Sequence, residues 1–401
     1  MKVFLLGAGA SKAYDQSPSG LRMPIARDFF EIYDKTSLAS DPWALTEGLI
    51  TYLEKWAGVG SAFEYLRSGV DIEALHSEIE SARNEAMKTG KYINWMVPYR
   101  AYNELVFLFA SVINEIQNGP VSKPHLNLVE ALNPEDAVIT FNWDTLMDRA
   151  LSEITPWRPD WGYGCPPQKI FRDGWTTPES ASSTSSAASL IKLHGSTNWL
   201  TAHPVTDGKK TIHSSHDLSA DAFAVYAHAT QAFSCFAGRY RGGFEPFSYG
   251  YYPPNLDFPG RAAPEGRVIV RYRPRVPWRE EGTADDSGLP SIPLIIPPVK
   301  NKSYEFFGDL FSNLWTSAED ALAAAEEIVV IGYSFPVTDT QSDTLFRRAF
   351  SRRTSLPRVS ILDPCPELVA TRFSRDYGLD HEHLRVEKDY FSADYDLGRL
   401  I

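Results

Sequence analysis

The chain has 401 residues, of which 43% are hydrophobic and 22% are charged, so it can bury a core and hold two or three domains or one domain with large insertions. Its formal net charge of -12 argues against a broad phosphate-neutralising surface, and direct nucleic-acid binding is therefore not expected, although several arginines lie between Arg267 and Arg279. No run of 18 apolar residues is present, which excludes a membrane-spanning helix.

The first element is a short apolar run, residues 2–6, that ends in Gly7-Ala8-Gly9-Ala10-Ser11. This pattern predicts a strand followed by a glycine turn, where the backbone can approach a ligand such as a pyrophosphate. The third glycine of the dinucleotide fingerprint is absent, because Lys12 stands there. The same residues resemble a minimal signal peptide, but we favour the buried strand.

Residues 12–24 are predicted to form a polar loop over the ligand, with Arg22 as its candidate phosphate-binding charge; a solvated arginine is the alternative. Residues 36–124 are predicted to be a helical insertion. One clear helix is predicted at residues 72–88, and a second is indicated by apolar residues at helical spacing that end before Gly119-Pro120. This apolar stripe consists of Leu105, Phe109, Val112 and Ile116.

A second strand is predicted at residues 137–140, and it runs into Asn142 and Asp144. The Asn142 amide can bind a sugar hydroxyl or a water, and the Asp144 carboxylate can accept a hydrogen bond from a carboxamide. The alternative is that one of them caps a helix over residues 146–151.

Residues 155–189 are predicted to be irregular, and a third strand at 190–193 then leads into His194. Open α/β sheets bind their ligands at the carboxyl ends of the strands, so His194 is a candidate site residue. The alternative is that His194 is buried in the core. Residues 201–290 are rich in proline, glycine and aromatic residues and predict an irregular or β insertion, with residues 267–272 as a candidate strand.

Three more strands are predicted at residues 293–296, 328–331 and 359–362. The second ends in Gly332 and Ser334 and the third in Asp363, an acidic residue suited to ribose hydroxyls. Helices are expected at residues 318–327, with Ser317 as the cap, and around 346–353. The last predicted segment is 381–387.

Strands that alternate with helices imply a mainly parallel sheet whose carboxyl ends share one edge. We therefore predict an α/β fold with a Rossmann-like domain made of residues 1–35, 125–200 and 291–401, interrupted by the insertions at 36–124 and 201–290. The polar strand ends then form one nucleotide site. Its predicted members are Gly7, Ala8, Gly9, Ser11, Arg22, Asn142, Asp144, His194, Gly332, Ser334 and Asp363.

No metal is expected at this site. Cys165, Cys235 and Cys365 are far apart and lack CxxC spacing, which suits a reducing, cytoplasmic compartment. A loose group of histidines has no familiar zinc spacing, and a polar surface loop is favoured there over a metal site. These histidines are His203, His213, His216 and His228.

In their order along the chain, these motifs resemble the NAD-site motifs of the sirtuin family, most closely the bacterial sirtuin-like proteins of antiphage defence. Pro297-Pro298-Val299-Lys300-Asn301-Lys302 is similar to a further segment of those proteins. The resemblance implies that the glycine turn and Gly332-x-Ser334 serve the phosphates, that Asn142 contacts the nicotinamide ribose and that Asp144 binds the carboxamide. It further implies that His194 is the catalytic base and that Asp363 holds the adenine ribose.

The chain departs from the protein-deacylating members of that family. It has no four-cysteine zinc module, residues 21–28 replace the Gly-Ile-Pro-Asp-Phe-Arg loop, and Phe141 replaces the glutamine of Thr-Gln-Asn. We therefore expect an NAD+ glycohydrolase that acts in antiphage defence, an abortive-infection response by NAD+ depletion. The alternatives are an NAD-dependent deacylase and a non-catalytic subunit that binds NAD or ADP-ribose.

Free NAD+ hydrolysis is toxic, so restraint until a trigger arrives is expected. The resemblance implies a homo-oligomer or a partner such as a HerA-type ATPase or an Argonaute-like protein. We expect the two insertions to make such contacts, and their composition does not favour one of these partners over another.

Overall fold

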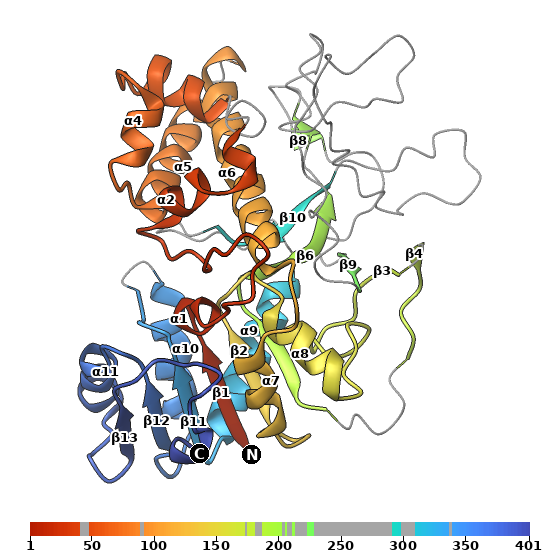
Figure 1. Cartoon of the computed structure of the whole chain (residues 1–401), viewed down its shortest axis with the longest axis vertical. Helices are drawn as coiled ribbons and strands as arrows, with labels where there is room; N and C mark the ends of the chain where they lie inside the picture. The colour runs from red at the N-terminus through yellow and green to blue at the C-terminus, as the bar shows by residue number, and fades with distance from the viewer. Residues whose placement is uncertain are drawn as a thin grey trace.

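The fold is described from a computed structural model, shown in Figure 1. The structure describes residues 1–40, 48–88, 92–172, 175–180, 187–202, 205–206, 211–212, 223–227, 291–297, 309–336 and 339–401. The predicted strand at 267–272 and most of the insertion at 201–290 lie outside these residues.

The central element is a six-stranded sheet in which every described pair is parallel, with the strand order β13-β12-β11-β1-β2-β5. The N-terminal strand β1 is central, and Leu5 lies between Val330 and Ile139 of its neighbours. Its apolar residues are buried because helices flank the sheet, as expected for a parallel sheet. The strands are β1 Lys2–Leu6, β2 Ala137–Thr140, β5 Ser189–Lys192, β11 Glu327–Ile331, β12 Arg358–Leu362 and β13 Leu384–Glu387.

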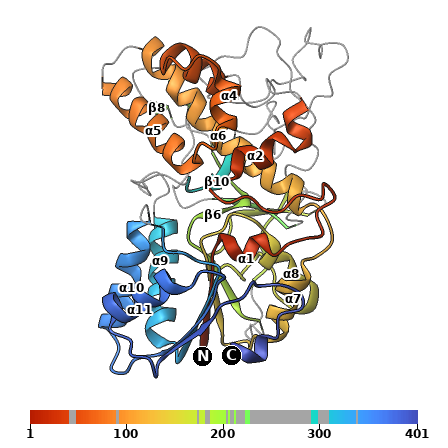
Figure 2. The same cartoon turned by 60° about the vertical axis from the view of Figure 1, so that its left-hand side comes forward.

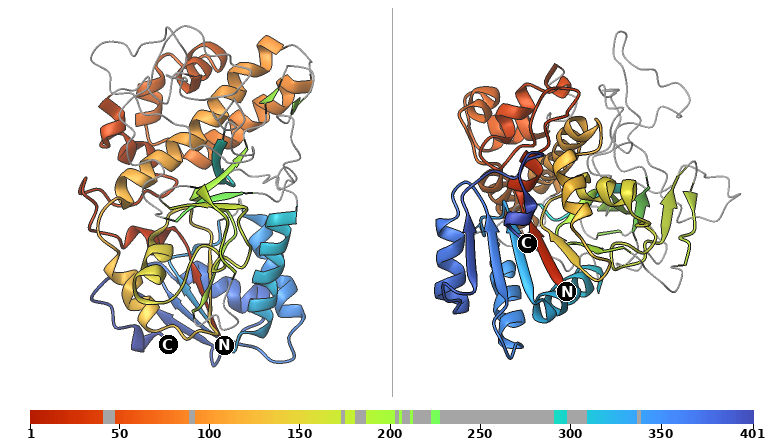
Figure 3. Two further views of the ribbon diagram at one scale, coloured as in Figure 1. Left: turned by 90° about the vertical axis from the view of Figure 1, so that its right-hand side faces the viewer. Right: turned by 60° about the horizontal axis from the view of Figure 1, so that its bottom comes forward.

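Helices flank this sheet, and the two chain termini lie at its amino end (Figures 1 and 3). These helices are α1 Ala8–Lys12, α7 Lys123–Glu130, α8 Leu146–Ile154, α9 Asp309–Ala324, α10 Thr340–Ser351 and α11 Glu367–Tyr377, and a short 3-10 turn, η5 Leu397–Arg399, follows near the C-terminus. The architecture is thus Rossmann-like, as predicted, and the first apolar run is a core strand.

A separate helical layer stands beyond the carboxyl edge of the sheet, as Figure 2 shows. Its long helices α5 and α6 pack against each other, and α5 has the predicted bounds. The layer has its own apolar core around residues such as Phe109 and Leu105. Its elements are α2 Phe29–Asp34, η1 Ser37–Ser40, η2 Tyr52–Trp56, α4 Ala62–Arg67, α5 Ile72–Lys88 and α6 Tyr92–Gln117.

A second sheet, mixed in direction, has the order β10-β6-β9-β3-β4. Its strands are β3 Lys169–Phe171, β4 Trp175–Thr176, β6 Gly195–Ala202, β9 Ala224–Tyr226 and β10 Ser291–Ile295, and a separate pair is formed by β7 Val205–Thr206 and β8 Thr211–Ile212. The chain leaves β5 of the first sheet at Lys192 and enters β6 of the second at Gly195, so Leu193 and His194 form the junction between the two sheets.

The structure differs from several expectations about these elements. The helix predicted at 318–327 is α9, which begins at Asp309 and ends at Ala324, because Leu310, Phe311 and Leu314 extend the buried face by two turns; Ser317 therefore lies inside the helix. The helix expected around residues 346–353 is α10, which begins at Thr340 and ends at Ser351. The strand predicted at 293–296 is present as β10, which is antiparallel to β6 of the second sheet. The region 155–189 is irregular only in part, since it contains β3 and β4.

Among the described residues, no helix is both long and apolar enough to cross a membrane.

Candidate active site

A cavity of about 590 Å³ lies between the carboxyl edge of the parallel sheet and the helical layer. Every predicted site residue except Arg22 lines it. The sheet side contributes Gly7, Ala8, Gly9, Ser11, Phe141, Asn142, Trp143, Asp144, His194, Gly332, Tyr333, Ser334, Pro336, Asp339, Asp363 and Cys365. The helical layer and the segment that leads into it contribute Met23, Pro24, Ile25, Ala26, Arg27, Phe29, Asp71, Ile72, Glu73, Phe109 and Ile113.

The two glycine turns of the site are pressed against each other. The Gly9 amide donates to the Gly332 carbonyl at 2.9 Å, and the Gly7 amide donates to the Ile331 carbonyl at 3.1 Å. A Cβ on Gly7 would lie 2.5 Å from the Gly332 oxygen, and Gly332 itself has a φ of +60°. Close packing of the two turns therefore already requires these glycines, while the exposed Ala8 and Gly9 border the cavity.

Ser11, Asn142 and Asp144 form one hydrogen-bonded group. The Asn142 Nδ2 donates to the Gly7 carbonyl and to the Ser11 Oγ, both at 2.7 Å. The Ser11 hydroxyl in turn donates to the Asp144 Oδ2. The other oxygen of Asp144, Oδ1, accepts from the Leu146 amide at 3.0 Å, at the start of α8. Asp144 therefore lines the cavity and also accepts from the first amide of α8, although the N-cap residue of that helix is Thr145.

His194 is held among aromatic rings at the junction of the sheets and is only 5% exposed. The Phe141 ring meets the imidazole edge-on at 5.2 Å, and the Trp143 ring lies near-parallel at 6.4 Å. The His194 carbonyl accepts from the Ile296 amide at 2.8 Å, which ties this junction to β10. The His194 Nε2 lies 3.7 Å from the Asp339 Oδ2. This histidine is thus buried and fixed in place, yet it lines the cavity and can contact a bound molecule.

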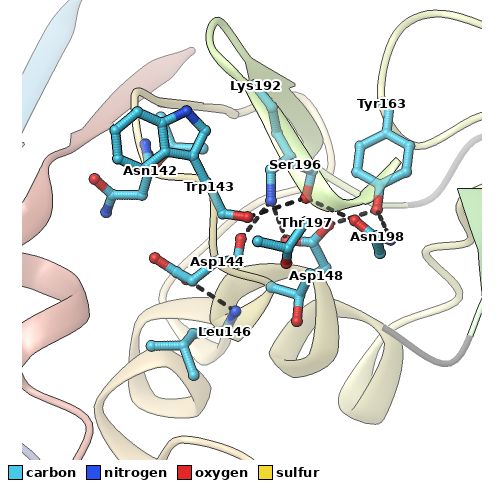
Figure 4. A network of polar contacts seen from close by, with 12 residues as sticks. Asn142, Trp143, Asp144, Leu146, Asp148, Tyr163, Lys192, Ser196, Thr197 and Asn198 are labelled. Carbon is cyan, nitrogen blue, oxygen red and sulfur yellow. Dashed lines mark hydrogen bonds and ion pairs between the residues drawn. The ribbon is translucent and has the colours of Figure 1, made fainter. Parts of the chain in front are cut away.

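A buried polar network lies next to Asp144, as Figure 4 shows. Lys192 is fully buried, and its Nζ donates to the Asp144 carbonyl at 2.5 Å and to the Asp148 Oδ2 at 2.9 Å. The Tyr163 hydroxyl donates to the Asp148 Oδ1 at 2.5 Å, and burial together with the Asp148 charge raises the pKa of Tyr163 well above its usual value. Lys192 therefore joins α8 to the backbone that presents Asp144 to the cavity.

Two arginines stand in the segment that precedes the helical layer, and the structure separates their roles. Arg22 is exposed, donates to the Ala13 carbonyl at 3.1 Å and pairs with Asp15 at 3.8 Å. Arg27 lines the cavity, and among its described lining residues it is the only Lys or Arg. Arg27 is thus better placed than Arg22 to meet a phosphate.

The carboxyl ends of β11 and β12 border the same cavity. Ser334 is exposed, and Asp363 is partly buried, with its Oδ1 accepting from the Cys365 amide at 2.7 Å. Phe141 stacks on Tyr333, with ring centroids 4.3 Å apart. An exposed hydroxyl and a carboxylate at this edge are groups that bind sugar or phosphate oxygens.

Sequence reasoning missed several residues of the cavity wall. Asp339 precedes helix α10 and resembles an ordinary cap, so nothing in the local pattern marks it as a cavity residue. Arg22 was the predicted phosphate-binding charge, and Arg27, which follows the predicted loop at residues 12–24, was missed. Phe109 belongs to the predicted apolar stripe, and Ile113 stands on the same helix α6 outside that stripe; both line the cavity.

No protein-family model matches the chain, and no match was found among curated proteins. Within the described part of the chain, no group of three or more His, Cys, Asp or Glu side chains is arranged to hold a metal ion. The loose histidine group from His203 to His228 lies outside the described residues.

Proposed function

We propose that this protein is an NAD+ glycohydrolase. The proposal rests on five strands that are neighbours in the sheet, β12, β11, β1, β2 and β5. Residues that follow the ends of these strands line one cavity, and a buried histidine is among them. Open α/β sheets bind nucleotides at this edge. A cavity of about 590 Å³ is within the range that holds cofactor-sized ligands.

In the proposed reaction, water adds to C1′ of the nicotinamide ribose and the bond from C1′ to the ring nitrogen breaks. The bonding electron pair leaves with the nicotinamide, and ADP-ribose and one proton are the other products. The sugar acquires oxocarbenium character in the transition state, as in glycoside cleavage. His194 takes the proton from the attacking water or from a ribose hydroxyl, a role suited to imidazole near neutral pH.

The neighbours of His194 offer complementary interactions. Asn142 and Ser11 form a hydrogen-bonded pair that positions the ribose and the water. Asp144 receives the carboxamide, which orients the leaving group. Arg27 supplies positive charge to the pyrophosphate, and Asp363 accepts from a ribose hydroxyl.

The test is incubation of the purified protein with NAD+, alone and with the product of a neighbouring gene, followed by chromatography of the products. We expect nicotinamide and ADP-ribose in equal amounts. O-acetyl-ADP-ribose formed with an acetylated peptide would indicate the deacylase instead. Thermal stabilisation by NAD+ without turnover would indicate a binding subunit.

A role in antiphage defence, in the cytoplasm where NAD+ is abundant, extends the proposal, and so does control by oligomerisation or by a partner ATPase. The support for this extension is the resemblance of the ordered motifs to sirtuin-like defence proteins. Phage-triggered loss of cellular NAD+ in cells that carry the gene is the corresponding measurement.

A further inference from the structure

Asp339 occupies a position that usually serves a helix, but its carboxylate is directed elsewhere. It is the N-cap residue of α10, yet its side chain caps no amide of that helix. Aspartate is favoured at this position because its oxygen accepts from the first helical amides. Asp339 is only 2% exposed and lines the cavity. Helix capping therefore does not account for the buried carboxylate.

The surroundings of Asp339 hold its carboxylate toward His194. The Asp339 Oδ2 lies 3.7 Å from the His194 Nε2 and accepts from the Tyr333 hydroxyl at 3.0 Å. The backbone is fixed on both sides, since the Asp339 amide donates to the Pro336 carbonyl at 2.9 Å and its carbonyl accepts from the Ser342 hydroxyl at 2.7 Å.

The aromatic rings complete this arrangement. Phe141 stacks on the Tyr333 ring, with 7° between the planes, and meets the His194 ring edge-on. The rings of His194 and Tyr333 thus both pack on Phe141, and the Asp339 carboxylate lies beside both side chains. Burial and the Asp339 charge together raise the pKa of Tyr333 well above its usual value, so its hydroxyl remains a proton donor to Asp339.

We propose that Asp339 is the positioning residue of His194: its carboxylate orients the imidazole and stabilises the imidazolium that forms when His194 accepts a proton. This inference rests on the proposed function in so far as His194 is the base. A buried carboxylate beside a catalytic histidine has this effect in other hydrolases, where the carboxylate itself stays ionised. Tyr333 has a secondary part, because its hydroxyl holds the Asp339 oxygen in place.

Other charged groups belong to the elements packed around His194. Asp144 comes from the turn after β2, and Lys192, which is paired with Asp148, from the end of β5. Farther along the cavity wall stand Asp363, Asp71, Glu73 and Arg27. The described ion pair of His194 is with Asp339, so Asp339→Asn removes the charge from this pair, although it also changes the acceptor of the Tyr333 hydroxyl.

The experiment compares Asp339→Asn with the matched control Asp343→Asn. Asp343 stands on the same helix, pairs with Arg347 and Arg372, and is not among the residues that line the cavity. For Asp339→Asn we expect kcat for NAD+ cleavage to fall by about 10²-fold or more, with KM within about threefold of wild type, because a general base contributes ~10²–10⁴-fold. Asp343→Asn should retain wild-type kcat, and Asp339→Glu should recover at least about tenfold over Asn, because it restores the charge.

A second readout does not depend on turnover. With histidines labelled at 13Cε1 and His194 assigned from the spectrum of His194→Gln, NMR follows the titration of this imidazole. The midpoint should fall by at least about one pH unit in Asp339→Asn, because an opposite charge this close favours the charged form. If wild type does not cleave NAD+, the proposed function fails, and this titration alone still decides the role of Asp339.

An unchanged midpoint in Asp339→Asn would overturn the inference, and so would wild-type kcat. If Asp339→Asn does not fold, Tyr333→Phe replaces it, since this change removes the hydroxyl but keeps the ring on Phe141. The midpoint and kcat should then move in the same directions by a smaller amount. Wild-type values in Tyr333→Phe would count against the inference.

Discussion

Lys192→Met tests the buried network next to Asp144. In the folded protein the Lys192 ammonium is fully buried and binds both the Asp144 carbonyl and the Asp148 carboxylate. Methionine keeps much of the side-chain volume but removes the positive partner of Asp148. The Asp148 carboxylate is 3% exposed, and its remaining described donor is the Tyr163 hydroxyl. Removal of one partner of a buried pair costs about 3–5 kcal/mol. We expect a loss of this size in the free energy of unfolding, measured by urea denaturation at pH 7.

A double variant and a surface control sharpen this measurement. Lys192→Met combined with Asp148→Asn removes both buried charges, so it should be more stable than Lys192→Met alone. Lys35→Met makes the same substitution in an exposed pair with Glu31 and should cost less than about 1 kcal/mol. A loss below about 1 kcal/mol for Lys192→Met, or a double variant less stable than the single one, would refute the reasoning.

Three further predictions follow from other parts of the molecule. Burial lowers the pKa of His76 to about 3, from 6.5 in the unfolded chain, so the folded protein loses stability as the pH falls below 6.5. Urea unfolding at pH 7 and pH 5 should show that wild type loses about 2 kcal/mol of unfolding free energy, a loss that His76→Leu does not show. Gly332→Ala places a Cβ 2.5 Å from the Ala10 nitrogen at a positive φ, whereas the Cβ of Gly378→Ala meets nothing within 4 Å. In thermal unfolding Gly332→Ala should therefore lose about 1–3 kcal/mol more stability than Gly378→Ala, and equal losses would contradict the close contact. Arg27→Gln should weaken NAD+ binding, measured by calorimetry, by about 10- to 100-fold, because a hydrogen bond to a charged group contributes ~1.5–3 kcal/mol. Arg22→Gln should leave the affinity unchanged, and the opposite result would indicate that Arg22 binds the phosphate.

The parallel sheet could be predicted from the sequence because its strands are local patterns. The central strands are short, largely apolar runs followed by glycine or polar residues, because burial on both faces of a parallel sheet requires such runs. The edge strand β13, with the sequence LRVE, has no such pattern. The predicted strands at 137–140 and 328–331 agree with β2 and β11 to within a residue. The same regularity placed the polar strand ends at one edge, where most of the predicted site residues do line a cavity.

The parts that were missed depend on contacts between distant residues. Strand β6 follows His194 directly, but its partner β10 lies about ninety residues later, so no local pattern shows the pairing. The helix α9 was predicted too late in the chain because a plausible cap at Ser317 was preferred over the buried residues that precede it. Asp339 has the sequence context of a helix cap, and only the fold shows that its carboxylate meets His194.

The most direct test of the proposed activity compares wild type with His194→Gln. NAD+ consumption is followed by release of nicotinamide, and NAD+ binding is followed separately by thermal stabilisation. We expect turnover to fall by ~10²-fold or more in His194→Gln, while NAD+ still stabilises a folded protein. Retained NAD+ cleavage by folded His194→Gln would contradict the assignment of His194 as the base.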